Sequence, residues 1–235
     1  MAGLTAQLRS ADPPAGVRIL LVGEVVAFVG LMMLFIWMAA PTRAADVRWH
    51  HVAMGIGILV LPICLNLLHG DRPADSGIRL DNIASAARPV VLATMVMGCG
   101  VVGLGLLRQD LQWISWKRFF ELFGTYLAWG FAQQYMLQAF ALRRLRQACI
   151  RPAIAVVLAA GLFGIVHAPN WGLVGATTFA GAVWCWIFLR RPNLIVLGLA
   201  HAVLAVLLYH CWKSLLGLTI GPAYVVRAAK SLGGL

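Results

Sequence analysis

Long apolar runs constrain this chain more than any other feature of its sequence. A transmembrane helix needs about 20 apolar residues to cross a hydrocarbon layer of ~30 Å, and no water is present there to hydrogen-bond an irregular backbone. Of the 235 residues, 61% are hydrophobic and only 11% are charged. We therefore expect an all-α polytopic membrane protein with about seven transmembrane helices, in the runs 18–40, 51–69, 89–107, 119–142, 151–168, 171–189 and 193–212.

The segments outside these runs are short, so no room is left for a soluble domain. Residues 1–17 form a polar N-terminal tail, and residues 18–235 form a single transmembrane domain. The apolar stretch 214–226 is too short to span and is broken by two glycines and a proline, which predicts an interfacial or re-entrant segment. The first run is too long for the apolar part of a signal peptide, so we expect a retained signal anchor.

The net charge of +11 indicates topology and lipid contact rather than a nucleic-acid partner. With the N-terminus inside, the tail and the even-numbered loops carry eleven of the 19 basic residues. Basic residues in short loops mark the cytoplasmic side of a membrane and attract anionic lipid headgroups. We expect an integral protein of a bacterial inner membrane with a cytoplasmic N-terminus, in contact with the bilayer and without nucleic acid.

Three glutamines, Gln133, Gln134 and Gln138, lie together in the fourth run. Side-chain amides at this depth need partners or a cavity because lipid offers no hydrogen bonds. A single amide is usually explained as a contact between helices, but three together indicate an internal polar site. Glu24, a carboxylate well inside the first run, has two interpretations: a group that reaches the interface or stays neutral, and a cavity residue.

Two histidines lie in later runs, His167 at the end of the fifth and His201 in the middle of the seventh. A lone span histidine is usually a packing residue, but imidazole beside a glutamine cluster also suits proton transfer or zinc. We expect no cofactor, because catalytic zinc has three protein ligands and these two histidines, the only metal candidates, make an incomplete set. The five cysteines are scattered and predict neither a disulfide framework nor a zinc knuckle.

The sixth run is rich in small residues and ends in two tryptophans. Small residues let helices approach closely, which would hold His167 near His201. Trp184 and Trp186, close to Arg190, are interpreted as part of an interfacial aromatic belt.

Residues 119–212 resemble the CPBP family of intramembrane proteases, which is related to the CAAX prenyl protease, a type II CAAX endopeptidase. The family pattern is E-E-x-x-x-R on one helix, F-x-x-x-H on the next and H-x-x-x-N further on. Phe163 and His167 match the second motif, His201 matches the later histidine, and Asn193 fits the usual approach to it. The resemblance implies that a glutamate and the first histidine activate water, while the second histidine and the asparagine stabilise the oxyanion.

The chain departs from this pattern at the acids, the arginine and the asparagine. Gln133 and Gln134 replace the glutamate pair, Gln138 replaces the arginine, and Ala205 stands in the place of the asparagine. An amide has no useful basicity, so Gln133 is no substitute for a general base. Because the acids and their likely counter-ion are absent together, no buried charge is left without a partner. This favours a natural variant over a disabling mutation.

Two functions remain open. The first is a CPBP-type intramembrane endopeptidase of altered chemistry, acting on a membrane protein or a lipid-modified peptide. His167 would be the base and His201 the oxyanion donor, Gln133 and Gln134 would orient water or substrate, and the site would be shaped by Gln138, Phe163, Asn170 and Asn193. The alternative is a non-catalytic scaffold, or pseudoprotease, that holds a peptide or a lipid-modified partner in the former cleft.

Depth along the helices raises one difficulty for a common site. Gln133 and His201 each lie ten residues from a basic loop, whereas His167 lies sixteen residues beyond Arg151. At 1.5 Å per residue the last separation is about 24 Å, against about 15 Å for the other two. A tilted helix, or one that begins outside the membrane, is needed to bring His167 to the others.

Overall fold

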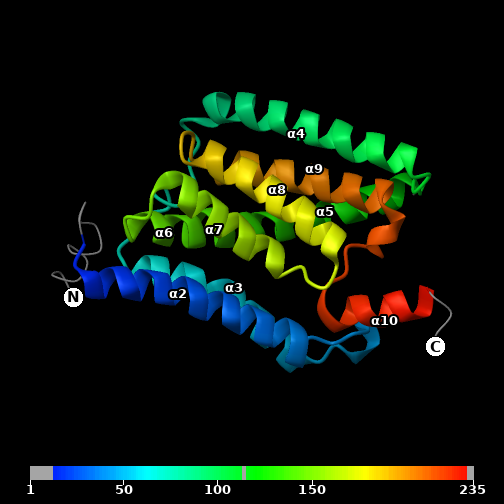
Figure 1. Ribbon diagram of the computed structural model, residues 1–235, viewed down its shortest axis with the longest axis horizontal. Coiled ribbons are helices and arrows are strands. Elements are labelled where there is room, and N and C mark those ends of the chain that lie inside the picture. The colour runs from blue at the N-terminus through cyan, green and yellow to red at the C-terminus, as the bar shows by residue number, and fades with distance from the viewer. Residues whose placement is uncertain (1–12, 113–114, 232–235) are drawn as a thin grey trace.

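The protein is seen in a computed structural model that describes residues 13–112 and 115–231 (Figure 1). Within that part of the chain every regular element is helical, and most of the tail predicted for residues 1–17 lies outside it. The helix α2 already begins at Ala15, and each of the seven apolar runs is helical over most of its length. The helical elements are α2 (Ala15–Leu34), η1 (Phe35–Ala39), η2 (Ala44–Asp46), α3 (Trp49–Leu68), α4 (Ile83–Leu107), α5 (Trp116–Gln134), η3 (Tyr135–Leu142), α6 (Arg143–Gln147), α7 (Pro152–Ile165), α8 (Trp171–Phe188), α9 (Leu194–Cys211), η4 (Lys213–Leu215) and α10 (Gly221–Ser231).

Five helical stretches of the described chain are long and apolar enough to cross a membrane. They are Ala15–Ala39, Trp49–Leu68, Ile83–Leu107, Trp171–Phe188 and Leu194–Cys211. The sequence predicts about seven transmembrane helices, but two of the predicted helices do not meet this criterion of length and apolarity. Charged residues lie in the first turns of α5, and α7 has only 14 residues. The chain is nevertheless a polytopic, all-helical membrane protein, and α5 runs without a break through the π-helical segment η3 into α6.

The helices lie side by side along one long axis (Figure 1). α4 lies on one side and packs on α9, which in turn packs on α5, while α7 packs on α8 and α2 with α3 form the opposite side. In α9, 67% of the span is buried, against 11–28% in the other four spans. The helix that carries His201 is therefore the central helix of the bundle.

Two glycines allow α5 and α9 to approach closely. A Cβ added to Gly198 would lie 2.8 Å from the ring of Phe131, and one added to Gly130 would lie 3.2 Å from the Cβ of His201. A Cβ at Gly198 would therefore clash with the ring, and one at Gly130 would force its neighbours to move slightly. The close crossing is what brings Gln134, one turn beyond Gly130, to His201.

The segment predicted as interfacial or re-entrant is a turn followed by the amphipathic helix α10, which packs against η1. The backbone N–H of Gly221 donates to the carbonyl of Ala168 at 2.9 Å. Gly221 has φ +55°, and a Cβ there would lie 2.6 Å from Cγ2 of Ile36. The turn and the start of α10 therefore lie against the end of α7 and against η1.

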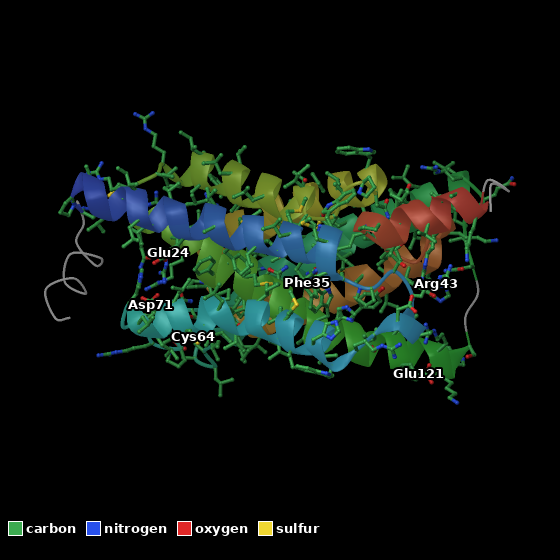
Figure 2. All side chains as sticks on the ribbon, turned by 90° about the horizontal axis from the view of Figure 1, so that it is seen from below. Glu24, Phe35, Arg43, Cys64, Asp71 and Glu121 are labelled. Atoms are coloured by element: carbon green, nitrogen blue, oxygen red, sulfur yellow. The ribbon has the colours of Figure 1, made fainter. Side chains whose placement is uncertain are left out.

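Most of the basic residues predicted to share one face do lie at one end of the bundle. The start of α2, the start of α4, the helix α6 and the connection before α9 meet there (Figure 1). Figure 2 shows Glu24 and Asp71 toward this end, which we call the arginine end, and Arg43 and Glu121 toward the other. The helix ends and connections at the arginine end carry Arg72, Arg79, Arg88, Arg143, Arg144, Arg146, Arg151, Arg190 and Arg191.

Candidate active site

Two adjoining cavities, of about 390 and 360 Å³, open inside the bundle. The first lies among α2, η1, α3, α5, η3 and α7, and the second among α4, α5, α8 and α9. They share part of their walls, including both a glutamine and a histidine that the sequence predicts as site residues. The shared residues are Trp129, Gln133, Phe163, His167, Leu218 and Ile220.

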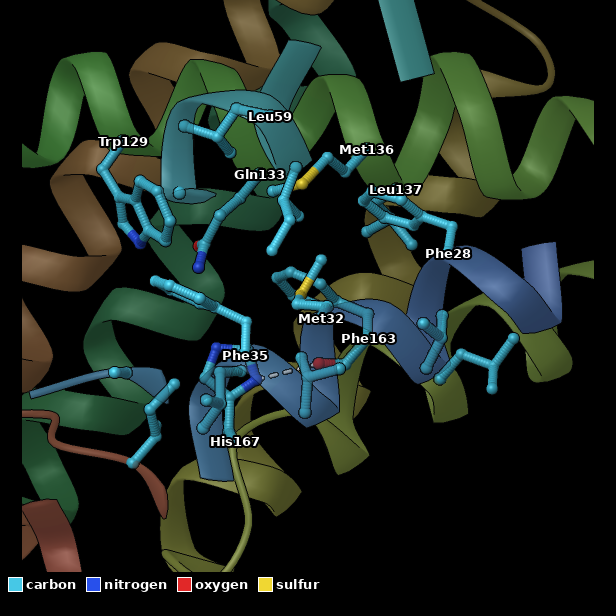
Figure 3. Close-up of a pocket in the computed structure, with 18 of the residues that line it drawn as sticks. Phe28, Met32, Phe35, Leu59, Trp129, Gln133, Met136, Leu137, Phe163 and His167 are labelled. Atoms are coloured by element: carbon cyan, nitrogen blue, oxygen red, sulfur yellow. Dashed lines mark hydrogen bonds between the residues drawn. The ribbon is translucent and has the colours of Figure 1, made fainter. Parts of the chain in front are cut away.

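Gln133 is the glutamine that faces the cavities. Its side chain reaches from α5 into the first cavity, and His167 lines the same cavity from the end of α7 (Figure 3). No group within the described chain hydrogen-bonds its amide. An amide offers both donors and an acceptor, so Gln133 is free to bind a polar group of a ligand.

Gln134 and Gln138 instead form a buried hydrogen-bond relay to His201. Nε2 of Gln138 donates to Oε1 of Gln134 at 3.2 Å, and Nε2 of Gln134 lies 3.1 Å from Nδ1 of His201. Because the Gln134 oxygen is already used, its NH₂ group donates to Nδ1, and the imidazole proton is assigned to Nε2. His201 lines the second cavity, so it offers an N–H donor there.

His167 has the opposite tautomer. Its Nδ1 lies 2.8 Å from the carbonyl oxygen of Phe163, which only accepts hydrogen bonds, so the proton is assigned to Nδ1. Oγ1 of Thr177 lies 3.4 Å from the same nitrogen. The unprotonated Nε2 therefore remains as a proton acceptor. Together the two histidines supply one acceptor and one donor to the same cavity, which both of them line.

The difficulty over the depth of His167 is removed by the short helix α7. This helix ends at Ile165, and His167 lies in the turn that follows. The Phe163 ring makes edge contacts with both histidines, at centroid distances of 5.2 Å to His167 and 6.3 Å to His201. Gln133, His167 and His201 thus meet along one connected space.

Asn170 and Asn193, which the sequence predicts as site-shaping residues, line neither cavity. Oδ1 of Asn193 caps α9 by accepting from the backbone N–H of Val196 at 3.1 Å. Asn170 caps α8 in the same way through Leu173, and its Nδ2 donates to the carbonyls of Leu215 and Thr219, both at 3.1 Å. We call residues 215–220 the strap, because Leu218 and Ile220 within it line both cavities.

Replacing Asn170 with aspartate is expected to loosen the strap. Aspartate still caps a helix, but it has no N–H for the two strap carbonyls, and each buried acceptor left unpaired costs about 1–3 kcal/mol. An Ile220→Cys reporter, in a background without the exposed cysteines Cys64, Cys99 and Cys149, should react several-fold faster with a soluble maleimide. Asn193→Asp is the matched control, and equal labelling rates in the two variants would contradict a role for Asn170 in holding the strap.

The sequence interpretation of Trp184 as an interfacial residue is wrong. Its side chain is buried and stacks on His201, with ring centroids 5.3 Å apart and planes at 25°. Trp186 is exposed, and its ring lies 4.1 Å from the guanidinium carbon of Arg190. Residues two apart lie on nearly opposite faces of a helix, so only Trp186 faces outward, while Trp184 holds the His201 ring.

A buried ion network near the arginine end was not predicted from the sequence. Arg144 is fully buried, its Nε donating to Oε2 of Glu24 at 2.9 Å and its Nη2 to Oδ1 of Asn66 at 2.7 Å. Oε1 of Glu24 lies 2.9 Å from Nε2 of His69. Glu24 is therefore an ion-paired residue that ties α2 to α6, and it lines neither of the two cavities (Figure 2).

Asp71 completes this network from the loop between α3 and α4. Its carboxylate accepts from Arg143 at 2.7 and 3.1 Å and from Arg144 at 3.3 Å. Burial acts to raise the pKa of Asp71, but the hydrogen bonds and charges of the two arginines outweigh it and hold the pKa below its usual value. Asp71 thus remains ionised and, together with Glu24, pairs with the two cations.

The donor set does not fit zinc. Within the described residues, no three His, Cys, Asp or Glu side chains come together as a group that would hold a metal ion. His167 and His201 each have Nδ1 engaged in a hydrogen bond, so the pair offers at most two nitrogen ligands. Catalytic zinc takes three protein ligands.

Several helices that line these cavities lie in a part of the chain that is similar to a known protein family. Residues 113–207 match the family model of the Rce1-like type II CAAX prenyl endopeptidases. No curated protein and no solved structure matches the chain. The matched region contains the three glutamines, Phe163 and both histidines. Over these residues, which are less than half of the chain, the protein is similar to the Rce1-like endopeptidases.

Proposed function

We propose that this protein is an intramembrane endopeptidase of altered chemistry, acting on membrane-embedded or lipid-modified peptides. The observation that carries the proposal is the pair of complementary histidines, an acceptor at Nε2 of His167 and a donor at Nε2 of His201, in one cavity. We further propose that the arginine end faces the cytoplasm of a bacterial inner membrane, which follows the positive-inside rule.

In the proposed reaction the substrate carbonyl accepts a hydrogen bond from Nε2–H of His201, assisted by the amide of Gln133. Nε2 of His167 takes a proton from water as the water oxygen bonds to the carbonyl carbon. His201 stabilises the oxyanion that forms. When the C–N bond breaks, His167 returns the proton to the leaving amine, giving a carboxylic acid and an amine.

The cavity walls favour a neutral and largely apolar ligand. Neither lining contains an Asp, Glu, Lys or Arg among the described residues. Aromatic and aliphatic side chains such as Phe28, Met32 and Leu59 form most of the first cavity. Apolar surface of this kind is stabilised by about 25 cal/mol for each Å² removed from water, which suits a hydrophobic peptide segment or a lipid chain.

A non-catalytic peptide-binding protein is the second candidate. It is favoured by the lack of any carboxylate in the two linings, since no acid orients His167 or supports its protonated form. Gln133 and His201 would still bind a peptide backbone, because amides and imidazole N–H groups pair with peptide carbonyls. The two candidates share a ligand class and differ in whether the bound peptide is cleaved.

The test uses the full chain in lipid nanodiscs with a panel of membrane-spanning and lipid-modified peptides, and mass spectrometry of their termini. We expect cleavage that falls by about 10²–10⁴-fold in His167→Ala, the usual contribution of a general base. His201→Ala should lose about 10²–10³-fold, the usual effect of removing an oxyanion donor.

His50→Ala, at an exposed histidine on the opposite side of the bundle from the arginine end, is the matched control. Saturable binding that requires His201, without any cleavage, would replace the first candidate with the second. Neither binding nor cleavage across the panel would rule out both.

A further inference from the structure

A third cavity, of about 570 Å³, opens at the arginine end of the bundle, apart from the two cavities described above. Guanidinium groups line it from two elements: Arg143 and Arg146 come from α6, and Arg190 follows α8. Leu142 and Phe188 give it apolar walls, and Gln138 also lines it. The cavity thus combines cationic and apolar surface at one end of the bundle.

The three arginines differ in how their charge is balanced. Arg143 is paired with Asp71 through two hydrogen bonds. Arg146 and Arg190 have no carboxylate partner in the described chain, and their Nη1 atoms donate only to the backbone carbonyls of Ile150 and Trp186.

One carboxylate also lines this cavity, that of Asp75. Its Oδ2 accepts from the backbone N–H of Arg72 at 2.9 Å. Two unpaired guanidinium groups against this single carboxylate leave the cavity with a net positive charge, which selects an anion.

Gln138 indicates that a ligand of this cavity should also carry a hydrogen-bond donor. Its side chain is fully buried, and its Oε1 has no hydrogen-bond partner among the described residues. A buried acceptor that is left unpaired costs about 1–3 kcal/mol. A ligand that carries a hydroxyl group beside its anionic group would satisfy both Gln138 and the arginines.

We propose that this cavity binds a glycerophosphate group, with the phosphate between Arg146 and Arg190 and a glycerol hydroxyl donating to Oε1 of Gln138. Basic pockets between transmembrane helices are suited to anionic lipid headgroups, and guanidinium pairs with phosphate through two parallel hydrogen bonds. Phosphatidylglycerol in the bilayer and free glycerol phosphate share this chemistry. Because Gln138 also donates to Gln134, a ligand here adjoins the relay to His201.

The experiment measures ligand binding to the purified full chain by native mass spectrometry and by the shift in unfolding temperature. The probes are short-chain phosphatidylglycerol, phosphatidylmethanol, which keeps the phosphodiester without hydroxyls, phosphatidylcholine, and glycerol 1-phosphate. We expect saturable binding of phosphatidylglycerol that weakens at least 10-fold in Arg146→Gln/Arg190→Gln. Arg108→Gln, at an exposed arginine that caps the other end of α4, removes one of the two charges lost in the double variant and should leave binding unchanged.

Each outcome decides one part of the proposal. Binding of glycerol 1-phosphate with the same dependence on the two arginines would support the site and identify a soluble source, whereas binding of the lipid alone would identify the bilayer. Equal affinity for phosphatidylglycerol and phosphatidylmethanol would overturn the role of Gln138. Equal binding by the double variant and by Arg108→Gln, or no saturable binding of any probe, would overturn the site. None of these results depends on whether the protein cleaves peptides.

Discussion

Arg144→Met is expected to destabilise the folded protein by roughly 3–5 kcal/mol, the usual cost of removing one partner from a buried ion pair. The guanidinium of Arg144 is fully buried and bonds Glu24, Asn66 and Asp71, which come from α2, from α3 and from the loop after α3. Methionine fills a similar volume but leaves the Glu24 carboxylate without its arginine. The loss should therefore loosen the attachment of α2 to the rest of the bundle.

The measurement is reversible unfolding in mixed micelles, followed by circular dichroism. Arg191→Met is the matched control, since Arg191 is exposed at the same end of the bundle, and we expect its effect to stay within about 0.5 kcal/mol. Adding Glu24→Gln to Arg144→Met should recover part of the loss, because the orphaned charge is then absent. A change in Arg144→Met no larger than the control would show that the network contributes nothing to stability.

Gln133→Glu is expected to raise the rate of amide hydrolysis by about 10²–10⁴-fold, the range in which a positioned general base acts. Gln133 is only half-buried, lines both cavities with His167 and has no partner in the described chain, so a carboxylate there is available to water. The family pattern likewise has an acid at this position.

Gln134→Glu is the contrasting variant, because it adds the same group one residue further along. Gln134 is fully buried between Gln138 and His201, and Gln138 stands where the family pattern has a cation. A carboxylate at that position has no arginine to balance it, so we expect a loss of stability and no gain in rate. Steady-state cleavage of one lipid-modified peptide by both variants makes the comparison, and equal rates in wild type and Gln133→Glu would count against hydrolytic chemistry in this cavity.

The sequence predicted the parts of the fold that depend on local pattern. Apolar runs, the glutamine cluster and the two histidines were all recognisable because lipid imposes strict rules on length and on buried polar groups. Depth along the helices misplaces His167 because the apolar runs do not all begin at the same level along the bundle. α7 instead comprises only 14 residues and ends before His167.

Contacts between distant segments were the features that the sequence did not reveal. Glu24 and Arg144 are 120 residues apart in the chain, and no local pattern indicates that an arginine of α6 turns inward to a carboxylate in the first helix. Trp184 was misassigned for a related reason, since its nearness to Arg190 suggested an interface while its face of α8 meets α9. In both cases the deciding information was the rotation of a helix about its own axis.

The π-helical segment η3 changes the direction in which the residues on either side of it face. A π-helix closes its hydrogen bonds over five residues rather than four, so the residues after it are turned relative to those of an uninterrupted α-helix. Gln134, just before η3, faces α9, whereas Arg144, just after it, faces α2. Insertion of a residue in an ancestral α-helix would produce such a segment, and the two ends of one helix could then acquire different partners and change independently. Substitutions at Gln134 are then expected to leave the charged contacts of Arg144, ten residues further along, undisturbed.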